Sequence, residues 1–222
     1  MPVNLDFWIV LQRWPELMLG ISNTIILALS GMTLALVIGI LGVAIQRAGE
    51  PISTFLVSGF VEIIRNTPFL VQIFFIFFAL PFLGIRLSQN VTAILALGLN
   101  GGAYAIEIIR AGVDAVPKGQ WEAGFALGLR ARDIFRIIVL KPALRAIYPS
   151  LTSQFVLLTL NTAICTSISA LELTSVGQRI EDETFRSFEV YFTLTAIYLV
   201  LSLCVMALLN VIGKRMFHYP TK

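Results

Sequence analysis

The residues that could do chemistry in this chain are polar groups inside apolar runs, not catalytic pairs. The sequence contains no nucleophile–base pair, no metal-ligand spacing of Cys or His, and no phosphate-binding G-x-x-x-x-G-K-[ST] loop. It does contain amides, hydroxyls and charged residues within long hydrophobic stretches. Such groups must bond to another helix, to water or to a polar ligand. We therefore expect non-covalent chemistry, with no enzyme activity, metal or cofactor in this chain.

The first such group is Arg65-Asn66-Thr67-Pro68, which interrupts an apolar run. The residue before a proline is pushed out of helical geometry, and proline itself suits the first turn of a new helix. The stretch therefore predicts a helix that breaks and restarts, with Asn66 or Thr67 as its cap. The exposed N–H groups of such an end can hold an anionic part of a substrate. In the other interpretation, Arg65 pairs with Glu62 and only marks the membrane boundary.

Two amides lie deeper in apolar runs. Asn100 lies within 91–113, where helix–helix contact and substrate contact fit it equally well. Glu107 and Arg110 follow at a spacing of three, so they can pair with each other near the membrane surface. Asn161 lies in the run 150–171, which carries many more hydroxyls and amides than a lipid-facing helix would. The polar residues of that run are Ser153, Gln154, Thr159, Asn161, Thr162, Thr166, Ser167 and Ser169.

The elements that must position these groups are membrane helices. Of the 222 residues, 57% are hydrophobic and 13% are charged, whereas soluble domains carry roughly 25% charged residues. We predict an all-α membrane protein with a single domain, 1–222. Its five spans are expected at 23–45, 54–85, 91–113, 150–171 and 190–213. An interfacial helix is expected before the first span, and an acidic loop at Glu172–Glu189 before the last. No basic tract indicates nucleic-acid binding.

The longest segment that does not suit hydrocarbon is 116–149. Trp121, Phe125 and Leu129 form a one-sided apolar stripe, and Asp133 can cap a second short helix that Pro142 disrupts. Six cations fall in the segment: Lys118, Arg130, Arg132, Arg136, Lys141 and Arg145. With the first connecting loop and the C-terminus, this side collects about ten Lys and Arg against four on the other. The positive-inside rule predicts a cytoplasmic helix–turn–helix, with the N-terminus outside and the C-terminus in the cytoplasm.

Several motifs resemble a known family. The segment Glu122-Ala123-Gly124-x3-Gly128 resembles the EAA loop of permease subunits of bacterial ABC importers. The stretches 62–72 (EIIRNTPFLVQ), 100–112 (NGGAYAIEIIRAG) and 117–123 (PKGQWEA) are similar to those of the polar amino acid permeases, the type that carries His, Glu, Gln, Arg or opines. The resemblance covers roughly residues 20 to 215.

The resemblance implies a fold, partners and residue roles. It implies the type I importer fold, an inner-membrane location and a pore made of two permease subunits. An ATPase would dock on each hairpin and bind ATP and Mg, and a substrate-binding protein would deliver the amino acid. The residues that would couple to the ATPase are Glu122, Ala123, Gly124 and Gly128. The residues that would line the substrate path are Thr67, Gln72, Asn100, Tyr104, Asn161 and Thr162.

The chain departs from the family pattern at three positions. Gly124 stands where the family usually has Ala, and this exchange should be tolerated because both residues are small. Lys141 stands where the family usually has Pro, and Pro142 follows one residue later, so the sequence does not fix where the local helix ends. Asn161 replaces the acid thought to help hold the substrate's amino group. That change retunes substrate binding or marks a non-binding half of a heterodimer.

Two other functions fit a membrane protein of this composition. An ion-gradient-driven secondary transporter would be expected to carry an ionisable residue deep in a span, whereas the acids here cluster near the predicted ends. A membrane assembly factor would recruit a partner through the hairpin, but it leaves the polar run 150–171 unexplained. The identity of the amino acid, and whether the two permeases are identical, stay open.

Overall fold

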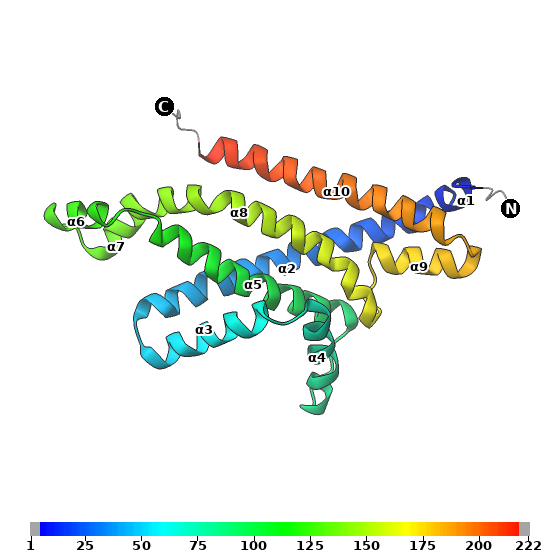
Figure 1. Cartoon of the computed structure of the whole chain (residues 1–222), viewed down its shortest axis with the longest axis horizontal. Coiled ribbons are helices and arrows are strands. Elements are labelled where there is room, and N and C mark those ends of the chain that lie inside the picture. The colour runs from blue at the N-terminus through cyan, green and yellow to red at the C-terminus, as the bar shows by residue number, and fades with distance from the viewer. Residues whose placement is uncertain (1–4, 218–222) are drawn as a thin grey trace.

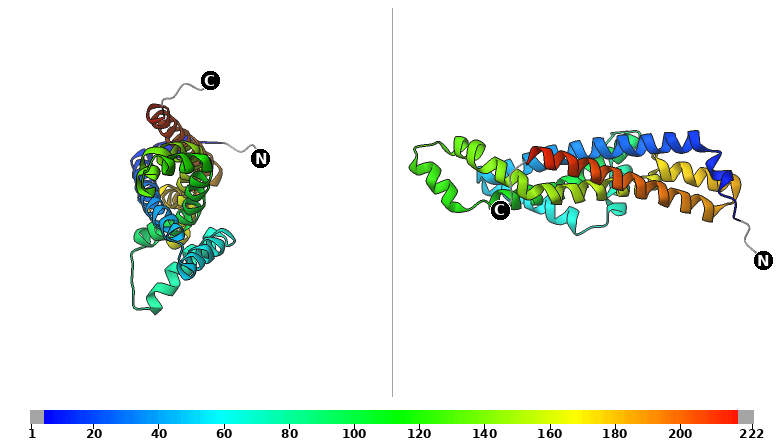
Figure 2. Two further views of the ribbon diagram at one scale, coloured as in Figure 1. Left: turned by 90° about the vertical axis from the view of Figure 1, so that its left-hand side faces the viewer. Right: turned by 90° about the horizontal axis from the view of Figure 1, so that it is seen from above.

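The computed structural model describes residues 5–217, and its regular structure there is entirely helical (Figure 1). The order is α1 (Trp8–Leu11), α2 (Trp14–Ala48), α3 (Pro51–Arg65), α4 (Phe69–Phe82), α5 (Gln89–Asp114), α6 (Lys118–Ala126), α7 (Ala131–Ile134), the π-helix η1 (Phe135–Val139), α8 (Leu140–Asn161), the 3₁₀-helix η2 (Thr162–Ile168), α9 (Leu173–Thr184) and α10 (Ser187–Met216). The molecule is elongated, with α6 and α7 at one end, here called the hairpin end (Figures 1 and 2).

The longest contact joins α2 and α5, which run side by side in the same direction. Small residues let the two helices approach, as is usual in membranes. A Cβ added to Gly39 would lie 2.7 Å from Ala105 Cβ, and one added to Gly31 would lie 2.9 Å from Leu97 Cβ. Because α2 and α5 are parallel, the segment between them must return across the same thickness.

That return is made by a broken element, as the sequence predicts. Helices α3 and α4 meet at an angle of 113° across the break at Asn66–Pro68. Helix α3 lies along the long axis of the molecule, and α4 points away from it (Figure 1). Together they meet the length and hydropathy requirements of one bent span, and the described residues contain four further candidate spans. The predicted fold class, an all-α membrane protein, is confirmed.

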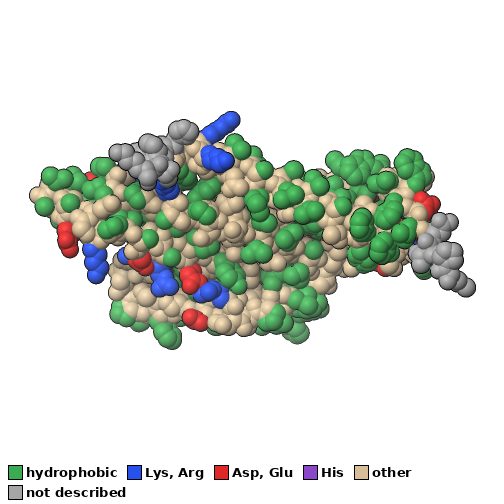
Figure 3. Space-filling view, turned by 45° about the horizontal axis from the view of Figure 1, so that its top comes forward, with side chains coloured by type: hydrophobic (Ala, Val, Ile, Leu, Met, Phe, Trp, Pro, Cys, Tyr) green, Lys and Arg blue, Asp and Glu red, His purple; other side chains and the backbone are tan. Residues whose placement is uncertain are grey.

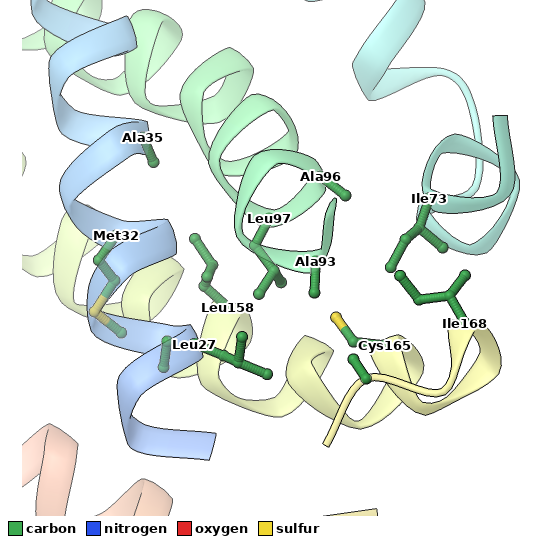
Figure 4. Close-up of a cluster of buried hydrophobic side chains, with 12 residues drawn as sticks. Leu27, Met32, Ala35, Ile73, Ala93, Ala96, Leu97, Leu158, Cys165 and Ile168 are labelled. Carbon is green, nitrogen blue, oxygen red and sulfur yellow. The ribbon is translucent and has the colours of Figure 1, made fainter. Parts of the chain in front are cut away.

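The main core lies where α2, α4, α5, α8 and η2 converge. Leu27, Leu97, Leu158, Ile73 and Cys165 are at most 1% exposed there (Figure 4). Two smaller clusters lie at the ends of the molecule, one under α9 and one inside the α6–α7 turn. The core therefore fastens α4 to the bundle through Ile73, with Phe69, Phe74, Ile76 and Phe77 of the same helix packed against it.

The helix that follows the hairpin differs from the prediction. Asp133 does not cap it, because α7 begins after Arg130, and Pro142 does not end it. Instead α7, η1, α8 and η2 form a single candidate span, Ala131–Ile168. The π-helix ends at Val139, three residues before Pro142, which lies in the first turn of α8. The expected start at residue 150 is therefore inside a longer helix.

The expected acidic loop also differs, because most of it is the amphipathic helix α9. Glu172 accepts a hydrogen bond from Ser175 N–H, and Ser175 Oγ accepts one from Glu172 N–H. This reciprocal pattern is a capping box, which starts a helix firmly. At the other end of the chain, α1 and the start of α2 occupy the expected interfacial stretch, apart from residues 1–4, which lie outside the described residues.

Charge is distributed unevenly along the molecule. In the face drawn in Figure 3, Lys and Arg side chains gather toward the hairpin end, and apolar side chains cover much of the rest. Large apolar side chains such as Phe55, Phe75 and Leu203 are more than half exposed. A surface of this kind fits a protein whose middle faces lipid or other membrane helices.

The close α2–α5 contact makes a testable prediction. Gly39→Ala would force two packed backbones apart, because Ala105 Cβ and carbonyl carbon lie within 3.2 Å of the added methyl. We expect a loss of about 1–3 kcal/mol of stability, read as a lower unfolding temperature in detergent. Gly59→Ala, with nothing within 4 Å of the new methyl, is the matched control and should be neutral or slightly stabilising. Equal effects of the two changes would contradict the packing account.

Candidate functional site

The helix break is closed by one side chain, Gln72. Its Nε2 donates to Ile64 O at 2.7 Å, to Thr67 O at 2.9 Å and to Thr67 Oγ1 at 2.9 Å. Two of these acceptors are carbonyls at and just beyond the end of α3, where no following turn can bond to them. Because Gln72 belongs to the first turn of α4, it joins the two halves of the broken element.

The same amide reaches a third helix. Gln72 Oε1 accepts a hydrogen bond of 2.9 Å from Asn100 Nδ2, and both residues are less than 9% exposed. The structure therefore shows Asn100 in a helix–helix hydrogen bond. Three of the six residues predicted to line the path, Thr67, Gln72 and Asn100, form one hydrogen-bonded cluster.

The predicted cap at the restart is wrong. Pro68 takes the N-cap position of α4, and no side chain bonds the first N–H groups of the helix. Asn66 and Thr67 instead serve the helix behind them. Asn66 Nδ2 donates to Glu62 O at 2.8 Å, and Thr67 Oγ1 donates to Ile63 O at 2.8 Å. Short polar side chains can bond backward as well as forward, which the sequence does not distinguish.

The ion pairs expected within single helices are replaced by one between helices. Arg65 pairs with Glu107, not with Glu62, and its guanidinium lies 5.7 Å from the centre of the Tyr104 ring. Glu107 accordingly pairs with Arg65 and not with Arg110. The pair fastens the end of α3 to α5 and lines a hollow of about 400 Å³ between α3, α5 and α8.

Asn161 and Thr162 lie at the point where α8 changes into the 3₁₀-helix η2. Thr162 is fully buried and donates to Thr159 O at 2.7 Å. Asn161 is half-buried, and its side chain makes no hydrogen bond to any other described residue. The structure does not join these two residues to the Thr67–Gln72–Asn100 cluster by a hydrogen bond. They form a separate polar position with an amide that is still free to bond.

The four predicted coupling residues lie together on α6 and the turn after it. Gly128 has φ +74°, and the N–H groups of Gly128 and Leu129 bond to Phe125 O and Gly124 O at 2.9 and 3.1 Å. This is a Schellman ending, which favours glycine. Gly124 is buried against Ile134 of α7, where an added Cβ would lie 2.7 Å from Ile134 Cγ1. The glycine is therefore used for packing, and Ala would not fit without a shift.

On the outer side of this turn, side chains are presented to solvent. Glu122 and Ala123 are exposed, and Phe125 and Leu127 are 55% and 77% exposed. The apolar stripe expected from Trp121, Phe125 and Leu129 is thus split, since only Trp121 and Leu129 pack on the hairpin core. Exposed apolar residues around a carboxylate at the tip of the molecule form a surface suited to a protein partner.

Sequence reasoning missed Glu172, which it placed in a loop. The residue is fully buried, and Tyr198 OH donates to its Oε2 at 2.6 Å while Ser175 N–H holds Oε1 at 2.7 Å. Burial raises the pKa of this carboxyl, and the hydrogen bonds from Tyr198 and the backbone oppose that rise. The spacing of Glu172 and Ser175 before an amphipathic run was the available signal. The carboxyl fastens α9 to α10.

Comparison with known proteins decides the family. Residues 31–218 match the model of the binding-protein-dependent transport system inner membrane component. The chain belongs to this family of ABC importer permeases. The glutamine transport system permease protein GlnP of Escherichia coli is 35% identical over 91% of this chain and 95% of its own length. The L-cystine transport system permease protein TcyB of Bacillus subtilis is 32% identical over 97% and 93%.

Solved structures agree with this assignment. A crystal structure of an amino acid ABC transporter with histidines matches 96% of this permease and 100% of its own chain, with TM-score 0.89 and 30% identity. An inward-facing methionine transporter, MetNI, shares the fold with TM-score 0.69 at 21% identity. Membership of this family favours an ATP-driven importer over an ion-gradient-driven transporter. In such importers a separate ATPase subunit hydrolyses ATP, so this permease is not itself an enzyme.

The Gln72–Asn100 bond gives a second prediction. Gln72→Met would leave the part-buried carbonyls of Ile64 and Thr67 without this donor. Because an unsatisfied group that is fully buried costs about 1–3 kcal/mol, we expect a loss of about 1 kcal/mol here. Asn100→Leu removes only the partner of Gln72 Oε1. In a double-mutant cycle read by thermal unfolding in detergent, we expect a coupling energy of about 0.5–1.5 kcal/mol. A coupling within error of zero would show that the amides do not act together.

Proposed function

We propose that this permease passes a polar amino acid across the bacterial inner membrane, together with a second permease subunit, two ATPase subunits and a substrate-binding protein. The observation that carries the proposal is the juxtaposition in one membrane chain of a polar path and an exposed hairpin. ATP binding would draw the ATPases together, and the hairpins would follow them. The helices would then alternate between outward and inward access.

The substrate class rests on the relatives and on the residues of the path. Relatives along nearly the whole chain are permeases for glutamine, L-cystine and nopaline, all of which carry an amino acid backbone. In this chain, Thr67, Gln72 and Asn100 form one hydrogen-bonded cluster, Tyr104 lies one turn after Asn100 on α5, and Asn161 and Thr162 lie where α8 meets η2. The free amide of Asn161 would accept the substrate's amino group without the charge that an acid supplies. That difference favours a substrate held mainly by hydrogen bonds.

The coupling role rests on the hairpin. Glu122 and Ala123 are exposed at its tip, Gly124 brings α6 against Ile134, and Gly128 sets the turn. A tightly packed hairpin continuous with the span Ala131–Ile168 would transmit a push from the ATPase directly to that span. ATP and Mg would bind to the ATPase and not to this chain.

The charges and exposed aromatic side chains of the surface support the proposed orientation and the proposed second permease. Cations in the last turns of α2 and α10 and in α7, among them Arg47, Lys214 and Arg132, favour a cytoplasmic hairpin and C-terminus with the N-terminus outside. Helix α4 leaves Phe75, Phe78 and Phe82 at least 60% exposed, and these aromatic side chains suit the face of a second permease. An identical or a homologous subunit would fit this requirement.

The third prediction tests coupling directly. The permease is reconstituted in proteoliposomes with its ATPase subunits and binding protein, and uptake is measured from a mixture of the twenty labelled amino acids. Glu122→Ala removes the exposed carboxylate at the docking surface, so we expect at least a roughly tenfold loss of uptake and of binding-protein-stimulated ATP hydrolysis. Glu50→Ala, an exposed carboxylate before α3, is the matched control and should behave as wild type. Normal coupled uptake by the Glu122→Ala protein would refute the docking role.

A further inference from the structure

A third polar position, besides the amide cluster and the Asn161–Thr162 pair, lies between the amide cluster and the hairpin end. It consists of Arg65, Tyr104 and Glu107, which line the hollow of about 400 Å³ together with Ser150 of α8. Asn100, Tyr104 and Glu107 recur at spacings of four and three, so they share one face of α5. Seven residues of helix place Glu107 about 10 Å beyond Asn100, toward the hairpin end.

We propose that this hollow is a binding site for the backbone of an α-amino acid, on the hairpin side of the path. The inference rests on the proposed function and adds a site to it. Arg65 would take the α-carboxylate through its forked N–H groups, and Glu107 would take the α-ammonium. The Tyr104 ring, already beside the guanidinium, would cover the ligand's charged end.

The charges on both sides make this exchange feasible. Without ligand, Arg65 and Glu107 satisfy each other. An amino acid zwitterion carries an ammonium and a carboxylate on the same carbon. When it binds, Arg65 exchanges the Glu107 carboxylate for the ligand's carboxylate, and Glu107 exchanges Arg65 for the ligand's ammonium. The net charge of the hollow therefore stays at zero. The two side chains are 38% and 35% exposed, and exposed ion pairs contribute little to stability. Opening the pair therefore costs little, whereas a buried pair would resist it.

The position of the site suits release. A ligand there competes with an ion pair that re-forms when it leaves, so binding is weak and departure is fast. The site recognises the α-carboxylate and α-ammonium groups, which all amino acids share. The ligand's side chain would occupy the remaining volume of the hollow without specific contacts. Discrimination between amino acids would then lie elsewhere on the path.

A second ion pair in the chain provides the control. Arg47 pairs with Asp114, which ends α5, so this pair also joins an arginine of one helix to a carboxylate of α5. Neither Arg47 nor Asp114 lines the hollow. Its side chains are 49% and 57% exposed, and it joins two helices outside the hollow, so it shows what a purely structural pair would do.

The test uses the permease–ATPase complex in nanodiscs, without binding protein, and measures binding by ligand-observed NMR. The probes are L-glutamine, 4-carbamoylbutanoate, which lacks the ammonium group, and 4-aminobutanamide, which lacks the carboxylate. We expect Glu107→Gln to weaken L-glutamine binding at least about tenfold. It should not weaken 4-carbamoylbutanoate binding, which needs only Arg65 and no longer competes with Glu107. Arg65→Gln should weaken L-glutamine binding but not 4-aminobutanamide binding, because it frees Glu107 for the ammonium group. Asp114→Asn should change the binding of none of the three probes.

Two results would overturn the site. One is an equal loss for all three probes in the Glu107→Gln complex, which would make the pair a structural clasp. The other is L-glutamine binding that is absent in wild type or unaffected by either change. Gel filtration and basal ATP hydrolysis confirm assembly, and if Arg65→Gln fails to assemble, Glu107→Gln decides alone. Uptake by the wild-type proteoliposomes separates the two ideas, because a complex that imports no amino acid refutes the proposed function itself.

Discussion

A chain buried in hydrocarbon must satisfy its own backbone hydrogen bonds, and this constraint shapes the whole permease. Where α3 stops, carbonyl groups lose the turn that would have bonded them, and the amide of Gln72 takes that place. The same amide reaches Asn100, so satisfying the break also ties it to the central helix α5. A 113° bend in a membrane element is stable because one side chain serves three helices.

The packing of the other helices depends on small residues that let two helix backbones approach each other closely. Glycines along α2 and α5 bring these helices into contact, and Gly124 and Gly128 do the same on a smaller scale in the hairpin. The span Ala131–Ile168 runs from that hairpin through a π-turn and α8 to the 3₁₀-helix η2 in the main core. The proposed coupling role uses this helix, because it has close packing at the hairpin and polar side chains at its other end.

Much of this could be predicted from sequence because its signals are local. Hydropathy indicated the membrane helices, and the Asn66–Pro68 stretch indicated the break. The errors arose where a residue could act in two directions. Thr67 bonds backward and does not cap α4, Pro142 lies inside a helix next to a π-turn, and Arg65 pairs across to Glu107. Only tertiary packing decides these, and the same holds for Glu172, whose partner Tyr198 lies 26 positions away.

The central claim is that the hairpin faces the cytoplasm, where an ATPase can reach it. Topology mapping tests this most directly, with Cys165 and Cys204 replaced by serine and one new cysteine at either Gly119 or Asp182, both of which are exposed. A membrane-impermeant maleimide should label Gly119→Cys only in inside-out vesicles and Asp182→Cys only in intact spheroplasts. Labelling of Gly119→Cys in intact spheroplasts would place the hairpin outside the cell and contradict the account.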